Sequence, residues 1–143
     1  MHWWEADGSR SRQPNESYSD ISRRTARITA NRRVPPGAIE QLLRTPETFE
    51  TWLRGQPLEA IVGDYFTPDD SPLANFIWDS LGVYVWTCDS IVDGKRFHAV
   101  PEWCVAFMRR EAEHVEQGWQ QAGRQEFTAA DVLTILQRAV SRE

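Results

Sequence analysis

Four side chains that commonly bind metal ions lie within 27 residues of one another: Cys88, His98, Cys104 and His114. Nine, five and nine residues separate them in turn. A structural zinc site usually takes its ligands in close pairs, two to five residues apart, because one turn must aim both side chains at the ion. The sequence has no such pair, so we expect neither a metal site nor a cofactor.

The dipeptide Asp93-Gly94 is a type I′ turn signal and predicts a hairpin that joins residues 90–92 to residues 95–98. Counting outward from a two-residue turn at Asp93-Gly94 places Asp89 opposite His98. This pair is a candidate polar site, but no nucleophile lies beside it. We therefore expect a stabilising cross-strand contact between the two side chains rather than catalysis.

The same register predicts the surroundings of the thiol of Cys88. Successive strand residues face opposite sides, so Cys88 is expected to share one face with Tyr84, Trp86, Val92 and Phe97. The strand phase also predicts that Trp86 is buried. An apolar setting raises the pKa of a thiol, which argues against a cysteine nucleophile.

The longest amphipathic pattern, at residues 101–119, has one irregularity: Glu111 falls within its apolar arc, and His114 follows three positions later. A carboxylate there must be paired, protonated or near an opening, because an unpaired buried charge is costly. Glu-x-x-His also occurs at di-iron sites, but these need a second copy and more carboxylates. Glu111 and His114 are polar site candidates. The simpler interpretation is that Glu111 lies at the edge of the apolar arc and pairs with an arginine such as Arg96.

Arginine supplies fifteen of the sixteen basic residues, and its distribution is uneven. The first 44 residues carry eight arginines against five acidic residues, whereas residues 45–143 carry eight basic residues against sixteen acidic ones. Arginine suits bidentate phosphate contacts, so the N-terminal segment is a candidate nucleic-acid-binding arm. Its candidate contact residues are Arg23, Arg24, Arg27, Arg32 and Arg33. A codon bias of the genome would produce the same arginine excess.

Seven tryptophans in 143 residues are unusual, and two of them, Trp3 and Trp4, stand in a polar segment without a core of its own. Tryptophan is enriched at the energetic centres of protein interfaces. This pair is therefore a candidate partner-binding site. Docking of the pair onto the rest of the chain and disorder of the segment are the alternatives.

The elements that position these residues predict a helix-dominated α+β fold. Residues 1–33 are expected to form a basic arm with a short helix within 19–31, and residues 34–143 a single domain. Apolar stripes predict four or five helices, and residues 83–100 a small antiparallel hairpin or meander. The segment 58–66 is compatible with either a strand or a turn of helix.

Several boundaries are predicted by capping residues. Ser71-Pro72 starts a helix that Gly82 ends, and Thr45 is expected to cap the helix that follows it. Thr128 is expected to cap the last helix together with the nearby carboxylate of Asp131.

One sequence pattern resembles that of small uncharacterised bacterial and phage proteins. It consists of Phe49-x-x-Trp52-Leu53, Val62-Gly63, Ser71-Pro72-Leu73-Ala74, Pro101-x-Trp103 and Thr128-Ala129-Ala130. The resemblance covers residues 46–140. It implies a common folding unit and carries no activity.

Size and composition narrow the function classes. A chain of 143 residues with 41% apolar residues can form one domain with a core of its own. We expect no membrane span and no secretory signal, and two cysteines favour a reducing cytoplasm. Without a visible catalytic constellation, the favoured function is a non-catalytic accessory or regulatory protein that binds another macromolecule, with protein as the favoured partner. The alternatives are nucleic-acid binding through the arginine-rich arm and an enzyme with an unrecognised site.

Overall fold

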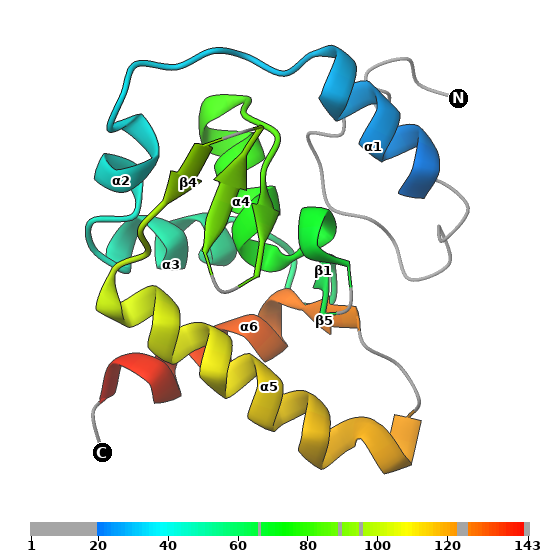
Figure 1. Ribbon diagram of the computed structural model, residues 1–143. Helices are drawn as coiled ribbons and strands as arrows, with labels where there is room; N and C mark the ends of the chain where they lie inside the picture. The colour runs from blue at the N-terminus through cyan, green and yellow to red at the C-terminus, as the bar shows by residue number, and fades with distance from the viewer. Residues whose placement is uncertain (1–19, 66, 89, 95, 123–125, 142–143) are drawn as a thin grey trace.

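The computed structural model describes residues 20–65, 67–88, 90–94, 96–122 and 126–141 (Figure 1). Their elements follow one another as α1 (Asp20–Thr29), α2 (Ala38–Leu42), α3 (Glu47–Arg54), β1 (Ile61–Asp64), the 3₁₀ turn η3 (Pro68–Asp70), α4 (Pro72–Leu81), β2 (Trp86–Thr87), β3 (Ile91–Asp93), β4 (Arg96–His98), α5 (Glu102–Ala122), β5 (Glu126–Thr128) and α6 (Ala129–Ser141). The protein therefore has the helix-dominated α+β fold that the sequence predicts.

Helix α4 forms the centre of the fold, and every residue from Pro72 to Trp78 is buried. Three phenylalanine rings join it to its neighbours: Phe49 of α3 lies 5.2 Å from both Phe76 of α4 and Phe107 of α5, measured between ring centroids. Helices α5 and α6 pack against each other on one side of this core (Figure 1). Burial of apolar side chains is the dominant favourable term in folding, and large rings such as these contribute a large share of the buried area.

Both ends of α4 agree with the sequence. The Ser71 hydroxyl accepts a 3.1 Å hydrogen bond from the backbone N–H of Ala74, as an N-cap does. Gly82 ends the helix with φ 70°, in the left-handed region that only glycine adopts readily. A side chain at Gly82 would also meet the side chain of Arg32 at 2.7 Å.

The segment left open between strand and helix forms β1, which pairs antiparallel with β5. Gly63 of β1 lies so close to α4 that a Cβ atom would meet the backbone nitrogen of Pro72 at 2.4 Å. Strand β5 leads directly into α6, whose start is capped as expected. The hydroxyl of Thr128 accepts from the N–H of Asp131, and the Asp131 carboxylate accepts from the N–H of Thr128, both at 3.1 Å.

The meander β2–β3–β4 forms, but its predicted register is wrong. Asp93 pairs with Arg96, and Ile91 pairs with His98, so Asp93 belongs to the strand and Gly94 begins the turn. The predicted register would have placed Ile91 opposite Arg96. Ile91 is fully buried, so that alignment would have carried the arginine to the inner face. Burial of Ile91 thus accounts for the observed alignment.

Two other expectations are corrected. The predicted meander starts at residue 83, but its first strand begins only at Trp86. The N–H of Tyr84 donates instead to the side-chain oxygen of Asn31 at 2.9 Å. Helix α3 has Pro46 at its N-cap position and no side-chain cap, so Thr45 does not perform that role.

Candidate functional site

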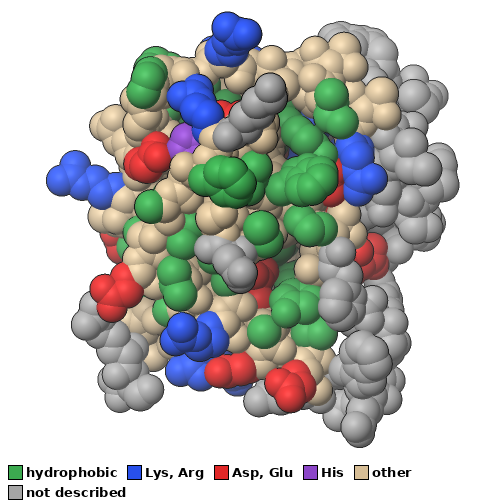
Figure 2. All heavy atoms as spheres, in the orientation of Figure 1, with side chains coloured by type: hydrophobic (Ala, Val, Ile, Leu, Met, Phe, Trp, Pro, Cys, Tyr) green, Lys and Arg blue, Asp and Glu red, His purple; other side chains and the backbone are tan. Residues whose placement is uncertain are grey.

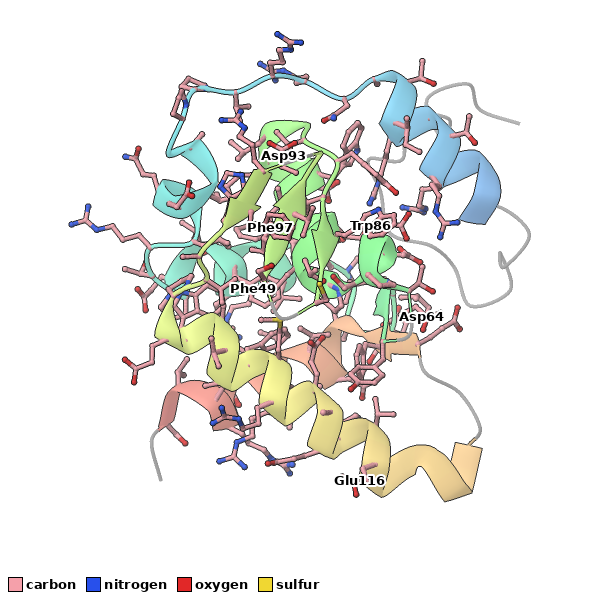
Figure 3. All side chains as sticks on the ribbon, in the orientation of Figure 1. Phe49, Asp64, Trp86, Asp93, Phe97 and Glu116 are labelled. Atoms are coloured by element: carbon pink, nitrogen blue, oxygen red, sulfur yellow. The ribbon has the colours of Figure 1, made fainter. Side chains whose placement is uncertain are left out.

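An exposed apolar row crosses the meander. Trp86 pairs with Val92, and Val92 pairs with Phe97, so one side chain from each strand lies on the same face. Trp86 is 53% exposed and Phe97 is 76% exposed. Figure 3 shows both large side chains over the meander, and Figure 2 shows hydrophobic side chains gathered on the same face of the molecule.

The grouping of these three residues agrees with the sequence, but the predicted burial of Trp86 is wrong. The opposite face of the meander, with Thr87, Ile91 and His98, is the one that is buried. A small sheet covered on one side leaves its other face in solvent. We call the row of Trp86, Val92 and Phe97 the apolar row.

A chain of hydrogen bonds holds Trp86 in place. Its indole N–H donates to the Tyr84 hydroxyl at 2.8 Å, and that hydroxyl donates to the Asp69 carboxylate at 2.6 Å. Arg24 of α1 pairs with the same carboxylate. Burial alone would raise the pKa of Asp69, but hydrogen bonds from Arg24 and Tyr84 hold it below its ordinary value. The apolar row is thus anchored to α1 through charged groups.

The arginines of the predicted arm occupy different environments. Arg27 is 2% exposed, donates a 2.5 Å hydrogen bond to the Asn75 side chain and lies over the Trp78 ring at 5.4 Å. Burial, with the charge of Arg23, lowers the pKa of Arg27 to about 10. Arg23 is half-buried, whereas Arg32 and Arg33 are exposed.

This segment therefore packs on the predicted domain through at least two of its arginines, Arg24 and Arg27. Arg32 contributes a backbone contact as well, since its N–H donates to the carbonyl oxygen of Gly82 at 3.0 Å. Trp3 and Trp4 lie outside the described residues, so their partner-binding role stays a prediction.

His98 is positioned by Glu40, a contact that no local pattern in the sequence predicts. Its Nδ1 atom lies 2.6 Å from the carboxylate of Glu40 on α2, and its Nε2 atom lies 3.8 Å from that of Asp93. The hydrogen bond to His98 lowers the pKa of Glu40. The expected partner Asp89 lies outside the described residues, and the observed register places Ile91 opposite His98 instead.

A groove of about 690 Å³ opens where β2 ends beside α5. Its lining comes from the loop before α4, the end of β2 and one side of α5: Tyr65, Pro68, Ser71, Thr87, Cys88, Val105, Met108, Arg109, Glu111 and Ala112. Glu111 is only 6% exposed, and burial raises its pKa to about 8. Among the described residues it has no hydrogen bond or ion pair, so the expected pairing with Arg96 is not seen.

The remaining candidates lie apart from one another. The His114 ring contacts that of Phe127, with centroids 5.8 Å apart. Cys104 is buried in the core, whereas Cys88 is exposed at the groove rather than within an apolar face. The described part of the chain holds no group of three or more histidine, cysteine or acidic residues arranged to bind a metal ion.

No family model, curated protein or solved structure matches this chain. The resemblance of residues 46–140 to small bacterial and phage proteins therefore stays a prediction. No helix in the described ranges is long and apolar enough to cross a bilayer.

Proposed function

We propose that this protein is a non-catalytic accessory protein that binds another protein through the apolar row. The observation that carries the proposal is the alignment of Trp86, Val92 and Phe97 on one uncovered sheet face. Single exposed apolar residues are common on protein surfaces, but a contiguous set is typical of interaction sites.

Preorganisation of the row supports the same function. The indole of Trp86 is held by Tyr84, and Tyr84 is held by Asp69, so binding would immobilise little that is not already ordered. Tryptophan is also among the residues that contribute most at interface centres. The free thiols of Cys88 and Cys104 fit the reducing cytoplasm expected from the sequence.

The nucleic-acid alternative has less support. Phosphate binding needs arginines that are free to face the ligand, but Arg24 and Arg27 are engaged with Asp69 and Asn75. Exposed Arg32 and Arg33 are the arginines of the predicted set that remain for this role.

The test is co-purification of the tagged full chain from its native host, with nuclease treatment, comparing the wild type with the Trp86→Ser/Phe97→Ser double variant. The matched control is Leu58→Ser, because Leu58 is 58% exposed at a different site. We expect one protein partner that survives nuclease, is retained by the control and is lost by the double variant. A partner retained by the double variant would contradict the proposal, as would a partner released by nuclease or self-association as the only interaction.

A further inference from the structure

The groove between the end of β2 and α5 has mostly apolar walls. Val105, Met108 and Ala112 of α5 form one side, and Pro68 and Thr87 lie on the other. Figure 1 shows α5 passing the end of the meander, and the lining of the groove includes residues from both. The groove is large enough for a small organic group.

The serine and threonine hydroxyl groups in the lining already have partners. Ser71 and Thr87 share a 2.5 Å hydrogen bond, and Ser71 also accepts from the N–H of Ala74. The Thr87 hydroxyl lies 3.3 Å from the carbonyl oxygen of Pro68, to which it can donate. These hydroxyls therefore stabilise the start of α4 and are not free to recognise a ligand.

Glu111 differs from them. Its side chain lines the groove, is more than nine-tenths buried, and has no partner among the described residues. An unpaired buried carboxyl group destabilises a fold unless something compensates for its lost hydration. A ligand with a complementary positive charge would provide that compensation.

We propose that this groove binds a primary ammonium group on an unbranched apolar stem, with the Glu111 carboxylate as its counter-ion. An ammonium group is a compact point charge, whereas a guanidinium group presents five donors that one carboxylate cannot satisfy. The apolar walls fit the stem. The ammonium group can belong to a free alkylamine or to a lysine side chain, since the two share this chemistry.

Other titratable groups face the same groove and define which cations fit. Arg109 of α5 is exposed and lines the groove, and its positive charge repels cations, most strongly those with more than one positive charge. Tyr65 follows β1, and Cys88 follows β2. Among the described residues that line the groove, Glu111 is the one carboxylic acid, so it is the expected counter-ion.

Binding of an ammonium ion has a distinctive signature. Because burial raises the pKa of Glu111 to about 8, the empty groove holds mostly the protonated acid at pH 7. Pairing with an ammonium ion requires the carboxylate, so the proton leaves to the buffer as the ion pair forms. Binding at pH 7 should therefore release protons to the buffer, up to one for each ammonium ion bound.

The experiment is calorimetric titration of the full chain with n-hexylammonium at pH 7, in two buffers whose ionisation enthalpies differ. Hexan-1-ol is the neutral comparison, and N-acetyl-lysine methylamide tests the lysine source. The variant is Glu111→Gln, which keeps the shape of the side chain. Glu116→Gln is the matched control, because Glu116 is exposed on the same helix (Figure 3).

We expect the wild type and Glu116→Gln to bind n-hexylammonium with proton release, and Glu111→Gln to bind it at least about tenfold more weakly without proton release. If N-acetyl-lysine methylamide also binds, a lysine side chain can supply the ammonium group. If it does not bind, a free amine supplies the group. The proposal is overturned if n-hexylammonium does not bind at millimolar concentration, if hexan-1-ol binds equally well, or if Glu111→Gln binds normally. None of these outcomes depends on the apolar row.

Discussion

Arg27 donates a hydrogen bond of 2.5 Å to Asn75, 48 residues further along the chain, and so joins α1 to the central helix α4. The Asn75 amide in turn donates to the carbonyl oxygen of Val62 on β1 at 2.8 Å. Asn75 therefore links the N-terminal helix, the central helix and the β1–β5 sheet. Loss of Arg27 would leave polar groups of this buried network without a partner.

The first prediction follows from that link. We expect Arg27→Ala to lower the free energy of unfolding by about 2–4 kcal/mol, because a buried hydrogen-bonded group and its packing on Trp78 are lost. Arg33→Ala is the control, since Arg33 is exposed, and should change stability by less than about 0.5 kcal/mol. Urea denaturation of both variants measures the difference. Equal stabilities of the two variants would show that α1 does not depend on this contact.

The same contacts bear on the predicted independence of residues 34–143. Removal of residues 1–33 should still leave a cooperative thermal transition, since the core and the helix caps lie within the remaining chain. The midpoint should fall, because the truncation removes the partners of Asp69 and Asn75. Calorimetry of the truncated chain tests both statements. A soluble fragment without any transition would show that α1 is an integral part of the domain.

The third prediction concerns the pH dependence of the free energy of unfolding. The pKa of Glu111 is raised from 4.5 to about 8 in the folded protein, so the unfolded chain loses this proton first as the pH rises. The contribution of Glu111 to stability is therefore complete below about pH 4.5 and is lost progressively as the pH rises through 8. Each unit of difference in pKa corresponds to about 1.4 kcal/mol.

Replacing Glu111 by Gln removes the titrating group and should reduce the fall in stability between pH 5 and pH 9. The variant should be more stable than the wild type at pH 9, and the difference should narrow towards pH 5. Urea denaturation at several pH values, with Glu116→Gln as the control, gives the comparison. Parallel pH profiles for the wild type and Glu111→Gln would contradict the raised pKa.

Local signals in the sequence were sufficient for both ends of α4 and the start of α6, although Thr45 does not cap α3. Ser71, Gly82, Thr128 and Asp131 perform the capping roles that their residue types predict, because a cap depends on neighbours within one turn. The position of Glu111 within an apolar arc was also visible from helical periodicity alone. Periodicity does not show whether such a residue is covered by another side chain or lines a groove.

Long-range partners were not predictable in this way. Strands β1 and β5 are separated by more than sixty residues of sequence, and Glu40 and His98 by 58. The turn of the meander illustrates a second limit. Asp93-Gly94 is a strong local turn signal, but the burial of Ile91 in the tertiary structure accounts for a different alignment.

A fourth prediction concerns nucleic acid. With Arg24 and Arg27 engaged inside the protein, we expect no retention of duplex DNA or single-stranded RNA probes in gel-shift assays at about 50 mM salt. If binding did occur, Arg32→Ala/Arg33→Ala should reduce both the affinity and its dependence on salt. Binding by the wild type that this double variant weakens would favour the nucleic-acid alternative over the proposed function.

The last prediction separates interaction from folding at the apolar row. Phe97 is 76% exposed and contributes little buried area to the isolated protein, so Phe97→Ser should change the free energy of unfolding by less than about 1 kcal/mol. Phe127→Ser provides the contrast. Phe127 is 2% exposed on β5, and its loss should cost about 3–5 kcal/mol. The two substitutions are chemically identical, so urea denaturation isolates the effect of burial. A large loss of stability in Phe97→Ser would mean that Phe97 supports the fold. That result would contradict the proposal that the apolar row is a binding surface for a partner.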